Sequence, residues 1–118
     1  MSGTDELQSI IKIFVFECRD LFGDRLSDMR LYGSYARGSQ KVDSDIDILI
    51  LLDMDSLEAR KHLGKICEIA FEIDLNHGVI LSPVVRSKND YDERKELPGF
   101  YNNVMREGVS IVAGGSIS

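Results

Sequence analysis

Two aspartates that enter an apolar segment are the residues of this chain best suited to chemistry. Asp45 and Asp47 flank Ile46 at the start of the run 46–52, which is apolar apart from Asp47. Side chains at positions i and i+2 of an extended strand lie on the same face, with Cα atoms about 7 Å apart. Two such carboxylates repel each other unless a cation lies between them, and Mg²⁺ is held by carboxylate oxygens, water and substrate phosphates. The pair therefore predicts a magnesium site, in which a buried Asp47 would be paired or metal-bound.

A turn of small residues precedes the aspartates and offers a phosphate site. It follows a predicted strand over 29–32 and reads Gly33-Ser34-Tyr35-Ala36-Arg37-Gly38. Gly33 lets phosphates approach the backbone, whose N–H groups act as donors together with the Ser34 hydroxyl. Arg37 either clamps the phosphates by its charge or is a surface arginine that ends the turn.

Two better-known ligand sites, the EF-hand and the Walker P-loop, are excluded because residues that they require are absent. Asp43, Asp45 and Asp47 match positions 1, 3 and 5 of an EF-hand loop, but Ile48 stands where the loop needs glycine and Met54 where it needs glutamate. A Walker P-loop is excluded because no Gly-Lys-Ser/Thr follows a glycine-rich loop.

The spacing of apolar residues predicts the elements that carry these groups. Apolar side chains at every third or fourth position predict amphipathic helices over 4–22 and 56–76. The run 46–52 is apolar on both faces, which is typical of a central buried strand. Residues 79–81 and 84–85 predict a further strand around Ser82-Pro83, and the proline favours a sheet edge or a bulge.

The C-terminal third completes the expected fold. Residues 87–97 are charged and predict a solvent-facing loop with a short helical turn, and Pro98 can open a last helix that runs to Glu107. Gly108 ends that helix before a short strand over 109–113. Helices that alternate with strands predict one small α/β (α+β) domain over 1–113, a mixed sheet of three to four strands with helices packed on it, followed by a flexible tail over 114–118.

Composition excludes several classes of partner. The 20 acidic and 14 basic residues leave a net charge of −6, so nucleic acid is not expected to bind except as the acceptor of a reaction. Cys18 and Cys67 lie in no Cys-x-x-Cys pair and no targeting segment starts the chain, which indicates the cytoplasm. No apolar run is long enough to cross a membrane.

Taken together, the glycine-serine turn, a ten-residue spacer and the Asp45-Ile46-Asp47 triplet resemble the DNA polymerase beta-like nucleotidyltransferase superfamily, and more narrowly its minimal nucleotidyltransferases. The resemblance implies the nucleotidyltransferase fold and Mg²⁺-dependent transfer of a nucleoside monophosphate from an NTP, expected to be ATP, to an acceptor hydroxyl. It implies that Gly33 and Ser34 hold the phosphates, with Arg37 beside them. Asp45 and Asp47 would be the catalytic ligands of one or two Mg²⁺ ions in an in-line displacement.

The third carboxylate of the family pattern is missing from its usual strand. Ser82 stands in the expected place, and residues 79–85 contain no acid. Asp74 would be the third acid if residues 71–75 were extended, whereas the helical pattern puts it on the last turn of helix 56–76. The function therefore divides into a competent transferase and a weakly catalytic nucleotide-binding module.

The small size of the chain favours a partner. The resemblance implies a small helical HEPN-type protein, with this chain as the antitoxin of a toxin–antitoxin pair. A homo-oligomer is the other expected assembly, since 118 residues leave little surface for both a nucleotide and an acceptor.

Overall fold

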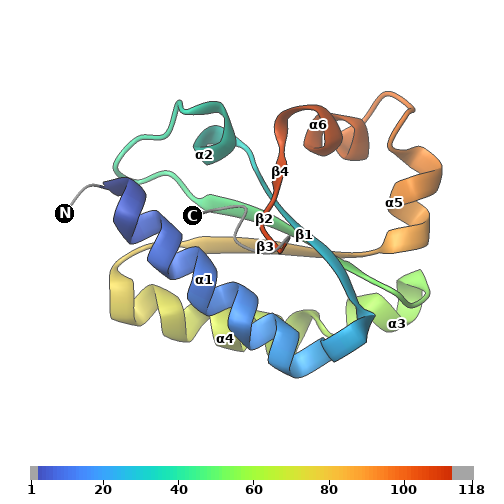
Figure 1. The fold of residues 1–118 in the computed structure, drawn as a ribbon, viewed down its shortest axis with the longest axis horizontal. Helices are drawn as coiled ribbons and strands as arrows, with labels where there is room; N and C mark the ends of the chain where they lie inside the picture. Colours follow the sequence, from blue (N-terminus) through green and yellow to red (C-terminus); the bar gives the residue numbers. More distant parts are fainter. Residues whose placement is uncertain (1–2, 113–118) are drawn as a thin grey trace.

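The computed structural model describes residues 3–112 and shows one sheet with helices on both of its faces (Figure 1). The elements are, in chain order, α1 (Gly3–Phe22), the short 3-10 helix η1 (Gly23–Arg25), β1 (Leu26–Tyr32), α2 (Ser34–Arg37), β2 (Ile46–Leu52), α3 (Ser56–Lys61), α4 (Leu63–His77), β3 (Leu81–Ser87), α5 (Lys88–Arg94), α6 (Phe100–Glu107) and β4 (Val109–Ser110). The predicted α/β class with a small mixed sheet is confirmed.

The sheet has the strand order β3-β2-β1-β4. β1 pairs antiparallel with both β2 and β4, and β2 pairs parallel with β3. The central strand β2 matches the predicted range 46–52, because six apolar residues around Asp47 fill the space on both faces of the sheet. β3 is an edge strand, as Pro83 had indicated, since an edge tolerates a residue that lacks a backbone N–H.

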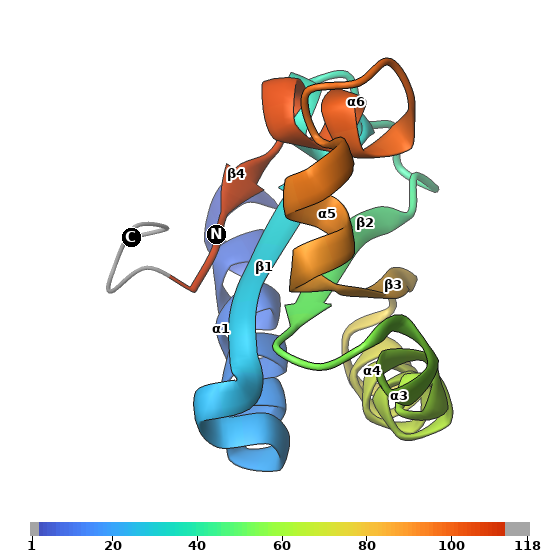
Figure 2. The same cartoon turned by 90° about the vertical axis from the view of Figure 1, so that its right-hand side faces the viewer.

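The two faces of the sheet carry separate apolar clusters. Alternate residues of β2 (Ile46, Ile48, Ile50 and Leu52) join α1 and α4 in the larger cluster. Leu49 and Leu51 point the other way and pack with Tyr91 of α5 and Val104 of α6. Figure 2 shows the same division, with α1 and α5 on opposite sides of the strands. In the described part of the chain no helix combines the length and apolarity that a membrane span requires.

Two helical predictions are corrected. The helix expected over 56–76 is two helices, α3 and α4, which meet at His62. The His62 ring packs edge-on against Phe22 with centroids 5.1 Å apart, and Asp55 caps α3 by accepting the Glu58 N–H. The short helical turn expected in the loop over 87–97 is the seven-residue helix α5, which is bridged by Lys88–Asp92 and Asp90–Arg94 ion pairs at helical spacing.

Several boundaries also differ from the predicted ones. The first strand begins at Leu26 rather than residue 29, and the strand predicted over 79–85 runs from Leu81 to Ser87 because Gly78 ends α4 in a left-handed conformation. The last helix begins at Phe100, after Gly99, rather than at Pro98. The final strand comprises Val109 and Ser110 only; the predicted tail over 114–118 lies outside the described residues.

Candidate functional site

The centre of the site is a close contact between Gly33 and Asp47. Tyr32 is the register partner of Asp47 across β1 and β2, so Gly33 leaves the sheet beside that carboxylate. Gly33 has φ +75° and ψ −154°, a conformation that is almost restricted to glycine. A Cβ atom on Gly33 would lie 2.2 Å from Asp47 Oδ2. The missing side chain is therefore what lets the predicted phosphate turn and the predicted metal ligand share one place.

The turn is held by its own backbone. The carbonyl of Gly33 accepts the N–H groups of Ala36 and Arg37, both at 3.1 Å, and the carbonyl of Ser34 accepts the N–H of Ser39 at 3.0 Å. Gly38 ends α2 in the left-handed conformation. These bonds keep Ser34 and Arg37 within one short helical turn of Gly33.

A second local turn delivers Asp45 to the sheet. The Ser44 hydroxyl accepts the Lys41 N–H at 2.7 Å, and the Ser44 N–H donates to the Lys41 carbonyl at 3.1 Å. The Ile46 N–H then donates to the Ile80 carbonyl at 2.8 Å and starts the parallel pairing of β2 with β3. Asp45 thus precedes the strand by one residue.

The two aspartates interact electrostatically. Burial raises the pKa of Asp47 above the ordinary 3.8, the charge of Asp45 raises it further, and Arg37 opposes both effects. The structure therefore brings Asp45, Asp47 and Arg37 near one another. A cation between the carboxylates would relieve the cost of two neighbouring negative charges. The oxygen donors suit a hard divalent ion such as Mg²⁺, which also takes water and phosphate oxygens as ligands.

Glu107, which the sequence did not single out, completes the surroundings of Gly33. Its Oε1 accepts the Gly33 N–H at 3.3 Å and the Arg37 Nη1–H at 3.1 Å. Glu107 is the last residue of α6, and the following Gly108 has no room for a side chain: a Cβ there would lie 2.4 Å from the Val104 carbonyl oxygen and 3.0 Å from that of Leu31. The sequence Glu107-Gly108 at a helix end was the available signal, but nothing local relates it to Gly33.

Within residues 3–112, no acid stands at the β3 position next to Asp47 where the family pattern places a third carboxylate. Ser82 is the parallel register partner of Asp47, so it does stand where the family pattern places an acid. Asp74 lies in α4, which rules out the extended alternative for 71–75, and its Oδ1 accepts the Leu81 N–H at 2.8 Å. Burial, followed by the charge of Asp45, raises the pKa of Asp74, and the Leu81 bond opposes this. Among residues 3–112 no group of three or more His, Cys, Asp or Glu side chains is arranged to hold a metal.

A family model described as Nucleotidyltransferase domain matches residues 11–109. The chain belongs to this family. The match spans the turn, the acid pair and Glu107, so nucleotidyl transfer, the reaction of the family, is its class of chemistry.

Relatives of known name agree with this assignment. "Putative protein adenylyltransferase MJ0604" from Methanocaldococcus jannaschii is 31% identical over 101 residues, which are 86% of this chain and 93% of that protein. "Putative protein adenylyltransferase MJ0141" from the same organism is 36% identical over 84 residues, or 70% of this chain and 82% of the relative. A solved structure titled "Structure of putative minimal nucleotidyltransferase" superposes with a TM-score of 0.61 at 24% identity, covering 93% of this chain and 97% of that one, and confirms the nucleotidyltransferase fold.

The contact of Gly33 with Asp47 predicts that alanine substitution destabilises the protein more at Gly33 than at Gly38. Gly33 and Gly38 both have φ +75°, but a Cβ on Gly38 meets nothing within 4 Å. Gly38→Ala should cost about 1–2 kcal/mol of unfolding free energy from the left-handed conformation alone. Gly33→Ala should cost more than about 3 kcal/mol, because the glycine-only conformation and the displacement of Asp47 add together. Urea unfolding of the two variants tests this, and equal losses would refute the contact.

The raised pKa of Asp47 predicts a pH effect of definite sign. Between the ordinary 3.8 and the raised value, the folded state binds more protons than the unfolded state, so Asp47 makes stability fall as pH rises. Without divalent ions, Asp47→Asn should therefore be more stable than wild type near neutral pH, and this gain should disappear below about pH 3.8. Added Mg²⁺ should stabilise wild type and not the variant. Asp43→Asn, at an exposed acid, is the control; a stability gain of the same size in both variants would contradict the assignment.

Proposed function

We propose that this nucleotidyltransferase moves the adenylate of ATP to a hydroxyl group of a protein, with Mg²⁺ as cofactor. The observation that carries the proposal is the contact of Asp47 with Gly33, since it joins an acid pair to a turn suited to phosphate. Adenylate and a protein acceptor are favoured because relatives at 31% and 36% identity are named protein adenylyltransferases.

The residues of the turn bind the phosphates in this reaction, and the two aspartates bind the metal. The Gly33 N–H and the Ser34 hydroxyl orient the phosphates, and Arg37 offsets their charge. Asp45 and Asp47 would hold Mg²⁺, which supplies charge neutralisation at the phosphates and a lower pKa for the acceptor hydroxyl. The acceptor oxygen forms a bond to the α-phosphorus while the bond from that phosphorus to pyrophosphate breaks, and the acceptor proton passes to solvent.

Transfer of label from α-labelled ATP tests the site. Loss of either carboxylate removes a ligand from the cation that offsets phosphate charge, so Asp45→Asn and Asp47→Asn should each reduce transfer at least about 100-fold. Asp43→Asn should transfer as wild type does. The proposal fails if wild type transfers no label to protein in Mg²⁺, or if the two site variants keep the wild-type rate.

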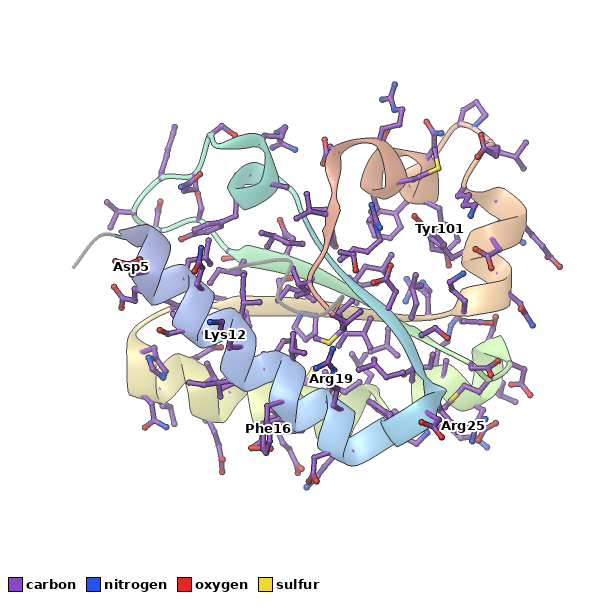
Figure 3. The ribbon with its side chains drawn as sticks, in the orientation of Figure 1. Asp5, Lys12, Phe16, Arg19, Arg25 and Tyr101 are labelled. Atoms are coloured by element: carbon purple, nitrogen blue, oxygen red, sulfur yellow. The ribbon has the colours of Figure 1, made fainter. Side chains whose placement is uncertain are left out.

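A second function, binding of a small helical HEPN-type partner as an antitoxin does, is favoured by exposed apolar side chains. Phe16 of α1 is 70% exposed, and Phe71 and Leu75 of α4 are 61% and 68% exposed. These helices pack against each other on one face of the sheet, and Figure 3 shows Phe16 projecting from α1 where α4 runs alongside. Exposed apolar patches of this kind are typical of protein interfaces.

Copurification with a HEPN-like protein encoded beside this chain tests the second function. Phe16→Ser and Phe71→Ser should leave the melting temperature near its wild-type value, because both rings are largely in solvent, and should release the partner. Leu57→Ser is the control, since Leu57 is equally exposed but lies on α3. A partner that stays bound to both phenylalanine variants would contradict the assigned surface.

A further inference from the structure

One oxygen of Glu107 accepts hydrogen bonds from two of the three groups that the proposed function assigns to phosphate, those of Gly33 and Arg37. The Gly33 N–H and the Arg37 Nη1–H donate to Glu107 Oε1 at 3.3 and 3.1 Å. The donors come from the turn after β1, whereas the acceptor comes from the end of α6, 74 positions after Gly33. This contact is therefore not required by the local geometry of the turn.

A carboxylate oxygen and a phosphate oxygen are equivalent hydrogen-bond acceptors for the Gly33 N–H and the Arg37 guanidinium. Both are anionic acceptors that form charge-assisted hydrogen bonds to a guanidinium and to backbone N–H groups. We propose that Glu107 occupies the position of a substrate phosphate oxygen and has to leave it before a triphosphate binds. Glu107 is thereby a positioning residue that sets the affinity for nucleotide. This inference rests on the proposed function, because it uses the phosphate site assigned there.

The structure allows the side chain to leave while the backbone stays. The side chain of Glu107 is 31% exposed and that of Arg37 is 52% exposed, and ion pairs with this much solvent contact are weak. Gly108 fixes the end of α6 against β1, since a side chain there would overlap the Val104 and Leu31 carbonyls. A rotation of the Glu107 side chain is thus enough to clear the two donors.

The opposite role for Glu107 makes the opposite prediction. If its carboxylate served to hold Arg37 in place for the substrate, loss of the carboxylate would weaken phosphate binding. If the carboxylate competes with phosphate, the same loss strengthens binding, because a site occupied for most of the time lowers the apparent affinity in proportion. The direction of the change separates the two roles.

Calorimetric titration with inorganic tripolyphosphate and Mg²⁺ is the decisive measurement. Glu107→Gln removes the charge and Glu107→Ala removes the oxygen; both should bind at least about fivefold more tightly than wild type, and the alanine variant most tightly. Glu93→Gln, at an exposed acid of α5, removes the same charge elsewhere and should bind as wild type does. Equal or weaker binding by the Glu107 variants overturns the proposal, as does the absence of tripolyphosphate binding in all four proteins.

Amide shifts of ¹⁵N-labelled protein give a second measure that does not depend on affinity. Tripolyphosphate should move the signals of residues 104–108 of wild type as well as that of Gly33, because Glu107 releases the turn. Signals over 104–108 that stay in place would refute the displacement. Tripolyphosphate carries no nucleotide, so a protein that binds it as expected but transfers no adenylate disproves the proposed reaction and leaves this inference standing.

Discussion

The absence of a side chain at residue 33 is the constraint on which the site depends. β1 must end and the chain must turn where β2 presents Asp47, and a Cβ at residue 33 would lie 2.2 Å from Asp47 Oδ2, so any other amino acid there would displace that carboxylate. The positive φ of Gly33 directs the following turn across the strand end. Gly33 thus determines the direction in which the chain leaves β1. It also determines how closely the backbone of the turn approaches the Asp47 carboxylate.

The charges around Gly33 suit the proposed combination of a cation and an anionic nucleotide. The charge of Asp45 disfavours the ionised form of Asp47, and Arg37 offsets only part of that effect while it also pairs with Glu107. A metal-bound triphosphate in the proposed site would bring positive charge to the aspartates and negative charge to the arginine, so each part of the ligand would meet its complement. A free nucleotide without metal would meet three carboxylates and one guanidinium.

Patterns read within one element predicted most of this structure, and contacts between distant elements account for what was missed. The apolar run around Asp47 and the turn after Tyr32 are local, so β2 and the positions of Gly33, Ser34 and Arg37 in the turn followed from the sequence. The break at His62 depends on packing against Phe22, and the length of α5 depends on the packing of Tyr91 against Leu49 and Leu51 of β2. Glu107 could not be found locally, since long-range contacts return the chain to Gly33: β4 pairs antiparallel with β1, and Arg30 of β1 donates to the Met105 and Gly108 carbonyls.

That return of the chain also has a consequence for the order of folding. The segment through β2 holds the turn and both aspartates, yet Gly33 and Glu107 come together only after 74 further positions have been placed. Contacts that close such long loops form late and slow the folding of a domain. A growing polypeptide therefore presents the Gly33 N–H and the Arg37 guanidinium without their Glu107 partner until α6 docks.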